Sequence, residues 1–328
     1  MRVLVTGASG RIGSALAGYL KSQGHWVRGF DLVKPSDQLD DSIAGSLNDN
    51  DALEQALDGV EAVAHLAALM AWHPKDLTRL FEINVTGTFQ LLSAAKGRGL
   101  KRFAFASSGE VYPELNPRSL PITEDHPTLP TSPYGMTKLL GETLVRNLGA
   151  QYDIPYVILR FSHTQTADEL LDPNGPVSGP RFHINAKIRQ LQGMPQTEPV
   201  QKTIAALQAV ATVPEQHYIS LNQSGEPFMM GVCDVRDLCK WIALGLTRDA
   251  AVGETFNIGG LHSFKFDEAI RYMARVTGLP VREVRLFTTD YRYETSIQKA
   301  VDVLGYTPEY DIFKMIDDAA TRRPAPSV

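Results

Sequence analysis

The stretch MRVLVTGASGRIGSAL, residues 1–16, places three glycines directly after a short apolar run. The run is typical of a buried strand, and the residues after it repeat their apolar side chains at helical spacing. Gly7, Gly10 and Gly13 therefore lie between a strand and a helix. In that context such a turn brings backbone N–H groups and a helix N-terminus against a pyrophosphate, so we expect a dinucleotide there.

An acidic residue follows at the end of the next apolar run. Asp31 closes the stretch WVRGFD and comes 18 residues after Gly13. A carboxylate at this place accepts hydrogen bonds from the adenosine ribose hydroxyls and repels a 2′-phosphate. The sequence therefore favours NAD over NADP, although Arg28 and Lys34 lie close by.

Strand and helix patterns alternate through the first half of the chain. We expect strands over residues 2–7, 26–31, 60–67, 102–108 and 156–161, and helices over residues 11–23, 49–56, 83–96 and 133–147. This alternation predicts an α/β fold, a Rossmann-type doubly wound parallel sheet with helices on both faces.

The alternation stops near Ser162. Residues 163–230 are rich in Pro, Gly, Asn and Gln, while residues 232–259 return to regular structure, as if the chain re-entered the first sheet. We therefore expect two interleaved domains. Residues 1–162 with 232–260 would form the NAD-binding Rossmann domain, and residues 163–231 with 261–328 a smaller α/β substrate-binding region.

The composition of the chain excludes several classes of binding partner. The formal net charge of the 328 residues is −5, with both signs interspersed, which gives no case for nucleic acid or a membrane as partner. No apolar run could span a bilayer, and the N-terminal residues lack signal-peptide regions. Cys233 and Cys239 are read as reduced thiols, and the eight histidines form no metal-binding pattern. We expect a cytoplasmic protein without a metal.

Tyr134 and Lys138 stand four residues apart in SPYGMTKLLGE, on one face of a predicted helix. A phenol is a poor base at neutral pH, but an adjacent ammonium and a cationic nicotinamide lower its pKa. Tyr134 could then exchange a proton with an alcohol. Taken alone, the same pair is also an ordinary surface contact of a helix.

Several further motifs accompany this pair, in one order along the chain. They are TGASGRIG at 6–13, HLAA at 65–68, NVTGT at 84–88, SSGEVYP at 107–113, YGMTK at 134–138, GETFNIGG at 253–260 and VLGYTPEYDI at 303–312. Together they resemble the extended short-chain dehydrogenase/reductase family, especially its NAD-dependent sugar epimerase and dehydratase branch. The likeness covers nearly the whole chain and thins at residues 163–230.

The resemblance implies roles for individual residues. Tyr134 would be the acid/base, Lys138 would hold the nicotinamide ribose, and Ser108 would hydrogen-bond the reacting oxygen. Asn84 would either help position the site or satisfy backbone groups. The implied cofactor contacts are Gly7, Gly10, Arg11, Ile12, Gly13, Asp31, Ser46, Leu47, Leu66, Ala67, Ala68, Asn84, Tyr134 and Lys138.

The sequence departs from the family where a diphosphate is held. Ser162 and His163 replace the usual Asn, and Met230 stands where an Arg is usual. A buried diphosphate without cationic partners is costly. These departures therefore argue against a nucleotide sugar as substrate and favour a smaller polyol, sugar or sugar acid. Arg181, Arg189 or His183 would supply replacement charge, or they lie on an exposed helix face.

Other positions carry open roles. Glu110 contacts substrate, acts as a second acid/base or caps its loop, and Gly109 replaces the Asp that precedes it in dehydratases. His163 is a substrate contact or a buried structural histidine. Ser46 stands where relatives often have an Asp that reads the adenine amino group. The candidate substrate contacts are Ser108, Gly109, Glu110, His163 and Arg181.

These observations predict an NAD-dependent enzyme that moves a hydride at a secondary alcohol or ketone of a sugar-like substrate, in the manner of an epimerase or dehydratase. One alternative is a dehydrogenase of a free sugar, polyol or sugar acid. Another is a non-catalytic NAD-binding sensor. The resemblance also implies a homodimer, formed through the helices near residues 84–97 and 134–148.

Overall fold

The computed structural model describes residues 1–36, 38–71, 74–288 and 291–322. The chain divides into two compact units, each made of three segments. The first consists of Met1–Ser162, Val235–Gly259 and Ser296–Thr307, and the second of His163–Asp234, Gly260–Thr295 and Pro308–Val328.

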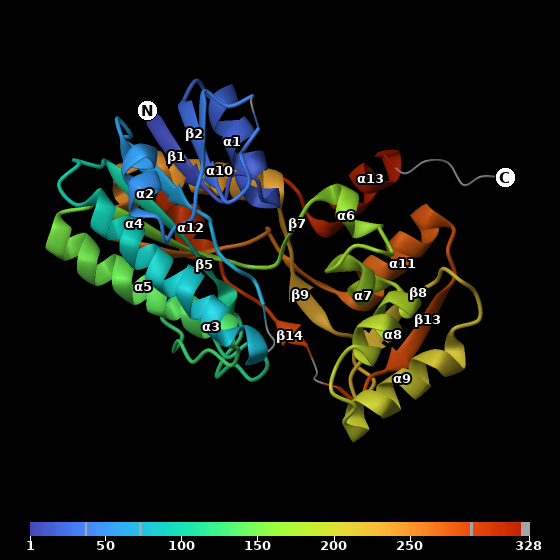
Figure 1. Cartoon of the computed structure of the whole chain (residues 1–328). Coiled ribbons are helices and arrows are strands. Elements are labelled where there is room, and N and C mark those ends of the chain that lie inside the picture. Colours follow the sequence, from blue (N-terminus) through green and yellow to red (C-terminus); the bar gives the residue numbers. More distant parts are fainter. Residues whose placement is uncertain (37, 72–73, 289–290, 323–328) are drawn as a thin grey trace. The chain divides into compact units, whose positions relative to one another are not determined.

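The first unit is built on a seven-stranded sheet in which every pairing is parallel (Figure 1). Its order is β11-β6-β5-β4-β1-β2-β3. The strands are β1 (Arg2–Thr6), β2 (Trp26–Asp31), β3 (Asp41–Ala44), β4 (Ala62–His65), β5 (Arg102–Ser108), β6 (Tyr156–Phe161) and β11 (Thr255–Ile258). The Rossmann-type prediction is confirmed, and β3 is a strand that we did not expect.

Helices cover both faces of this sheet, so its strands are buried on each side. One face carries α1 (Arg11–Ser22), α10 (Val235–Thr247) and α12 (Gln298–Leu304). The other carries α2 (Asn50–Leu57), α4 (Gly87–Ala95) and α5 (Pro133–Tyr152). Apolar side chains of α2, α4 and α5 pack in one cluster with Phe103 and Phe105 of β5, and each fully buried ring of this kind contributes roughly 1.5–3 kcal/mol.

Two helices differ from their predicted bounds. The predicted helix over residues 83–96 begins earlier, as a π-helical stretch at Phe81–Thr86 that leads into α4. The helix α5 starts at Pro133, where the Ser132 side chain accepts a hydrogen bond from the Gly135 N–H, and runs past residue 147 to Tyr152.

In its described residues the second unit contains three small sheets rather than one large one. The first pairs β10 (Cys233–Asp234) with β7 (Thr164–Gln165), the second orders β12 (Ser263–Lys265), β9 (Met229–Gly231) and β14 (Arg292–Tyr293), and the third pairs β13 (Val281–Arg285) with β8 (His217–Leu221). Its helices are α6 (Ala167–Leu170), α7 (Ser178–Phe182), α8 (Ile184–Gln192), α9 (Glu198–Val210), α11 (Phe266–Thr277) and α13 (Ile312–Arg322).

The structure corrects the predicted division at two places. We placed all of residues 261–328 in the second region, but Ser296–Thr307 belongs to the first unit, where Lys299 Nζ donates to the Thr255 carbonyl and Tyr306 donates to Asp237. We also placed residues 232–260 in the first domain. Val235–Gly259 lies in the first unit, with β11 in its sheet, whereas β10 pairs with β7 in the second unit. Residues 323–328 lie outside the described part of the chain.

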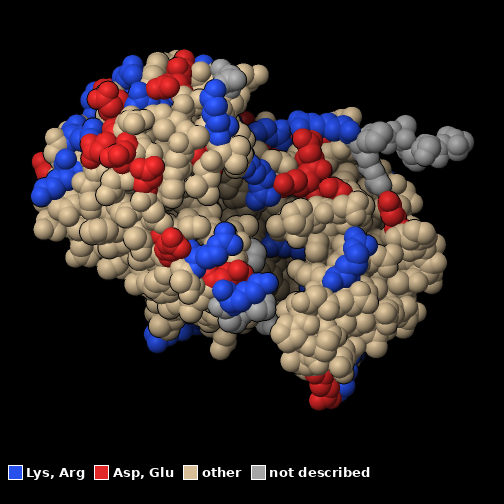
Figure 2. All heavy atoms as spheres, in the orientation of Figure 1, with Lys and Arg blue, Asp and Glu red and all other residues tan. Residues whose placement is uncertain are grey.

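No helix in the described ranges is both long and apolar enough to cross a membrane. Acidic and basic side chains are mixed over the visible face of the first unit, at the upper left of Figure 2. This mixing agrees with the small net charge of the chain.

Candidate functional site

The glycine turn lies between β1 and α1, at the carboxyl end of β1. Gly7 has φ +73°, which favours glycine, and a Cβ there would lie 2.9 Å from the Ala67 nitrogen. A Cβ on Gly13 would lie 2.0 Å from the Gly7 carbonyl oxygen. Gly7 thus permits the turn, and Gly13 lets α1 pack directly on it.

This turn stands at the point where the strand order reverses. The chain passes from β1 to β2 and β3 on one side, and from β4 to β5 and β6 on the other. Thr6 at the end of β1 is the register partner of His65 at the end of β4. In open parallel sheets, ligands bind outside the carboxyl ends of the strands at such a reversal.

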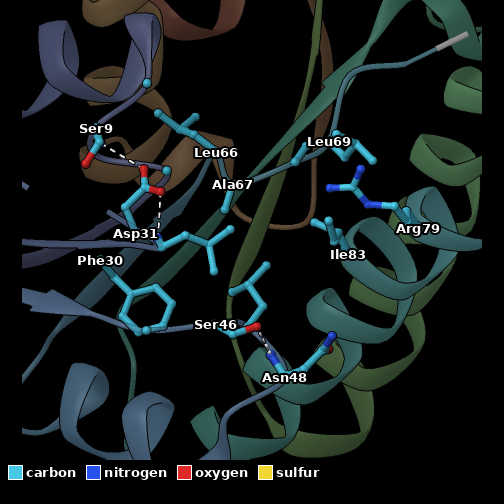
Figure 3. A pocket seen from close by; sticks show the side chains of 16 residues that line it. Ser9, Phe30, Asp31, Ser46, Asn48, Leu66, Ala67, Leu69, Arg79 and Ile83 are labelled. Carbon is cyan, nitrogen blue, oxygen red and sulfur yellow. Dashed lines mark hydrogen bonds between the residues drawn. The ribbon is translucent and has the colours of Figure 1, made fainter. Parts of the chain in front are cut away.

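A pocket of about 460 Å³ opens there (Figure 3). The predicted cofactor residues that line it are Gly7, Gly10, Asp31, Ser46, Leu47, Leu66, Ala67 and Ala68. Its remaining lining residues, which we did not predict, are Ser9, Phe30, Leu32, Gly45, Asn48, Leu69, Arg79 and Ile83. The predicted residues outside its lining are Arg11, Ile12, Gly13, Asn84, Tyr134 and Lys138.

Most of the missed residues are neighbours of predicted ones, so the motifs could have been read more widely. Arg79 is different, because it reaches in from α3 (Leu77–Leu80), a short helix without a motif (Figure 3). Ser46 accepts a hydrogen bond from the Asn48 N–H, at 3.1 Å. Its hydroxyl thus lies on the pocket wall beside the Asn48 side chain.

The Asp31 carboxylate is held in place by backbone donors. Its Oδ2 accepts from the Ser9 N–H at 2.9 Å and its Oδ1 from the Leu32 N–H at 2.7 Å. Arg28 is turned away toward Asp41 and donates to three carbonyls at the end of α2. The pocket wall therefore carries the Asp31 carboxylate, and Arg28 is already engaged elsewhere.

His65 ties the glycine turn to the HLAA loop. The Thr88 hydroxyl donates its hydrogen to the Asn84 carbonyl, so it accepts from His65 Nε2–H, and His65 Nδ1 then accepts from Thr6. Thr6 Oγ1 in turn accepts from the Ala67 N–H. Burial, and then the charge of Lys138, lowers the pKa of His65 to about 3, so its ring is neutral at physiological pH.

The side-chain amide of Asn84 is hydrogen-bonded to backbone groups and to a hydroxyl. Its Oδ1 accepts from the Leu69 N–H at 2.8 Å, and its Nδ2 donates to the Leu69 carbonyl and to Thr137 Oγ1. Of the two roles left open for Asn84, these bonds fit the satisfaction of backbone groups. They also connect the pocket wall at Leu69 to helix α5.

Tyr134 and Lys138 lie one turn apart on α5 and both are buried. Lys138 Nζ donates to the Ala106 carbonyl at 2.8 Å and lies 5.6 Å from the centre of the Tyr134 ring. Burial lowers the pKa of Lys138 to about 8. This contact with β5 places the lysine beside the strand that ends in Ser108.

We expected the Tyr134 phenol to have a lowered pKa, and the chain by itself shows the opposite. Burial, and then the negative charge of Glu110, raises the pKa of Tyr134 above its ordinary value. The phenol is therefore protonated at neutral pH in this structure. The lowered pKa stays a prediction that requires the positive charge of an oxidised nicotinamide.

Ser108, Gly109 and Glu110 form the turn that follows β5. Ser108 Oγ accepts from the Glu110 N–H, and Glu110 Oε2 accepts from Ser132 Oγ. A Cβ on Gly135 would lie 2.1 Å from the Glu110 carbonyl oxygen, so α5 packs directly on this turn. The structure thus brings the predicted Ser108, Glu110, Tyr134 and Lys138 together in the first unit.

The other predicted substrate contacts belong to the second unit. His163 Nδ1 accepts from Arg181 Nη2 at 3.0 Å, and its Nε2 bonds the Tyr291 hydroxyl. Burial, and then the charge of Arg181, lowers the pKa of His163, which keeps this ring neutral. Met230 is completely buried in the apolar core of its unit and cannot act as an anion contact.

His183 and Arg189, the other two candidates for replacement charge, lie in different surroundings from Arg181. His183 is buried and its ring lies 4.6 Å from that of His217. Arg189 is exposed on α8.

The sequence model of the NAD dependent epimerase/dehydratase family matches residues 3–259. The chain belongs to this family. NAD is accordingly its cofactor, and the glycine turn, the pocket and Asp31 fit that molecule. The resemblance seen in the sequence is confirmed, and the chain is an NAD-dependent enzyme of the epimerase/dehydratase type.

Individual relatives agree over nearly the full length. A crystal structure of a short-chain dehydrogenase/reductase superfamily protein from Agrobacterium tumefaciens with bound NAD is 43% identical, with a TM-score of 0.90 over 98% of this chain and 96% of that one. The UDP-glucuronic acid 4-epimerase from Bacillus cereus, in complex with NAD, is 25% identical, with a TM-score of 0.73 over 98% and 97%. A UDP-glucose 4-epimerase from Halalkalibacterium halodurans is 29% identical over 94% of this chain and 91% of its own.

Proposed function

We propose that this family member moves a hydride at a secondary alcohol or ketone of a sugar-like substrate, with Ser108, Tyr134 and Lys138 as its catalytic residues. The observation that carries the proposal is the position of α5: Lys138 lies 5.6 Å from the Tyr134 ring centre and donates to the Ala106 carbonyl of β5, while Gly135 packs on the turn after Ser108. A buried phenol, an ammonium and a hydroxyl suffice to move one proton at one oxygen.

Bound NAD supplies the hydride acceptor. Tyr134 exchanges the proton of the reacting oxygen, and Ser108 Oγ hydrogen-bonds that oxygen. Because the Tyr134 phenol is protonated in this structure, it is ready to donate to a ketone, and it needs a neighbouring positive charge to accept from an alcohol. Lys138 supplies one such charge and, we propose, donates to the nicotinamide ribose.

The further cofactor contacts follow from the pocket. Asp31 accepts from the adenosine ribose hydroxyls, while Ser46 and Leu47 lie at the adenine. The N-terminus of α1, with Gly10, Arg11 and Ile12, holds the pyrophosphate. Replacing Asp31 by Ala would weaken NAD binding about tenfold, measured by calorimetry, because charge-assisted hydrogen bonds to the ribose are lost.

For the reaction subtype we propose an internal redox cycle of the epimerase kind, in which the hydride returns to the same molecule. The full-length relatives that act on UDP-glucose and UDP-glucuronic acid support it. Dehydration is less well supported, because Gly109 stands before Glu110 without a carboxylate of its own.

A second candidate is a dehydrogenase of a free sugar, polyol or sugar acid that releases NADH. The burial of Met230 favours it, because an apolar side chain replaces a cationic contact for a diphosphate. In either case we propose that the second unit binds the substrate, with His163 holding Arg181 toward an anionic or hydroxyl-rich group.

The test is to isolate the protein, determine whether NAD is retained, and follow absorbance during incubation with nucleotide sugars, free sugars and sugar acids. Retained NAD and a new stereoisomer without net NADH would establish the epimerase. NADH that accumulates with one free sugar or acid would establish the dehydrogenase. A protein that binds NAD and turns over none of these compounds would contradict both and leave the sensor.

We also propose a homodimer formed through α4 and α5. Phe89 on α4 and Met136 on α5 are 45% and 36% exposed, which gives this face apolar side chains for a partner copy. Sedimentation of the wild type against Phe89→Glu would test it, and a monomeric wild type would contradict it.

We also propose a cytoplasmic location. It is supported by Cys233 and Cys239, which are free thiols in the structure, as is usual in a reducing compartment.

A further inference from the structure

A row of buried polar residues crosses three neighbouring strands of the first unit. Ser107 of β5 is the register partner of Arg160 on β6, and Arg160 is the partner of Asn257 on β11. All three are at most 5% exposed. Register partners point to the same face of a sheet, so these side chains form one line, a single residue behind Ser108. We call it the polar row.

Helix α5 reaches this row through Glu142, which is completely buried. Glu142 Oε1 accepts from Ser107 Oγ at 2.6 Å and from Arg160 Nε at 2.8 Å, and Oε2 accepts from Arg160 Nη2 at 2.8 Å. Glu142 lies one turn beyond Lys138 and two beyond Tyr134. Helix α5, which carries Tyr134 and Lys138, is thus hydrogen-bonded through Glu142 to β5 and β6, and these bonds fix its position along the two strands.

The same row holds the loop after Ser108. Arg160 Nη1 donates to the Tyr112 hydroxyl at 2.6 Å, and that hydroxyl donates to Asn257 Oδ1 at 2.8 Å. The Asn257 N–H donates to Glu124 Oε1 at 2.7 Å. Both structures that flank the candidate catalytic residues, helix α5 and the Ser108 loop, are therefore anchored to one arginine.

Stability alone is a poor reason for this arrangement. Burying a carboxylate and a guanidinium costs several kcal/mol of hydration for each ion, and apolar residues of similar volume often stabilise a protein as well or better. A bidentate pair does supply a defined geometry, because the planar guanidinium accepts few positions of the carboxylate.

We propose that the polar row and Glu142 position the Ser108, Tyr134 and Lys138 side chains for proton transfer, with Glu142, Arg160, Ser107 and Tyr112 as positioning residues. This inference rests on the proposed function of those three side chains. It assigns the row no contact with substrate or cofactor.

The test uses NAD as the probe and the double variant Glu142→Leu/Arg160→Met, which removes both buried charges. The pH midpoint of Tyr134 ionisation is measured by ultraviolet difference spectroscopy against the matching Tyr134→Phe protein, with and without NAD. The charged side chains near this phenol, Glu110 and Lys138, are unchanged in the variant. In the wild type we expect NAD to lower the midpoint.

In the double variant we expect the NAD-induced lowering to shrink by about one pH unit and NAD affinity to fall about tenfold, because Lys138 is no longer held at a fixed place. A lowering equal to that of the wild type would overturn the inference. If NAD fails to lower the midpoint even in the wild type, the proposed function fails and the inference with it, so the two failures are distinguishable.

Two milder variants and a control guard against misfolding. Ser107→Ala and Tyr112→Phe each remove one hydroxyl from the network and should shift the midpoint in the same direction by less. Arg102→Met removes another buried arginine, at the amino end of β5, where it donates to the Gly245 and Arg248 carbonyls. It should lower the melting temperature without moving the midpoint, and an equal shift in this control would overturn the inference.

Discussion

The central sheet of the first unit and the short strand β7 of the second unit differ in how their buried polar side chains are hydrogen-bonded. In the sheet, His65 of β4 bonds Thr6 of β1 and Thr88 of α4, and Glu142 of α5 accepts from Ser107 of β5 and Arg160 of β6. On β7, Gln165 is completely buried, and within the described part of the chain neither its amide nitrogen nor its amide oxygen has a hydrogen-bond partner. A large parallel sheet brings distant polar residues into register, whereas small sheets leave such groups dependent on loops or ligands.

The largest effect should come from the first unit. Tyr134→Phe would lower turnover roughly a thousandfold, because it removes the proton donor, and would leave NAD affinity within about threefold. The measurement is turnover with the compound found in the substrate screen, together with NAD titration. A variant that kept a tenth of the activity would show that another group, such as Glu110, moves the proton.

The glycine turn offers a matched pair within one helix. Gly13→Ala would place a methyl 2.0 Å from the Gly7 carbonyl and should cost about 3 kcal/mol of stability and most of the NAD affinity. Gly18→Ala is the control, because nothing lies within 4 Å of its Cβ. It should stabilise the protein by about 0.5–1 kcal/mol in urea unfolding, since alanine favours helices. Equal effects at both positions would contradict the close packing of α1.

The neutral His65 predicts a pH window. Its pKa is about 3 in the folded state and 6.5 in the unfolded state, so its contribution is complete above pH 6.5 and is lost as the pH falls toward 3. Within this window the wild type should lose about 1.4 kcal/mol per pH unit through His65. Urea unfolding of the wild type and His65→Gln at several pH values tests this. Parallel curves would show that His65 is not the source.

The smallest effect should come from the second unit. Gln165→Leu would leave stability unchanged or raise it by about 1 kcal/mol, because an unbonded buried amide is replaced by an apolar side chain. Gln216→Leu is the control, since Gln216 donates to the Val210 carbonyl and accepts from the Thr212 N–H, and it should cost about 1–3 kcal/mol. If Gln165→Leu is as costly as its control, the contrast between β7 and the sheet of the first unit disappears.

Much of the first unit follows from local sequence. The glycine turn, Asp31 and the spacing of Tyr134 and Lys138 are short-range patterns, and strand–helix alternation leaves few topologies once crossovers are right-handed. The fold class and the family were therefore predictable, and most of the pocket lining sits beside predicted residues. The chain by itself thus determined the fold class, the cofactor and the candidate catalytic residues.

Only the tertiary structure decided which distant residues meet. It placed α12 in the first unit, brought Arg79 to the pocket and aligned Ser107, Arg160 and Asn257 on three strands. It also showed that burial and Glu110 raise the pKa of Tyr134 in the chain without NAD, whereas the predicted lowering depends on the charges of Lys138 and an oxidised nicotinamide. The physical reason is that burial, register and the electrostatic field of a site depend on long-range packing, which no local spacing encodes.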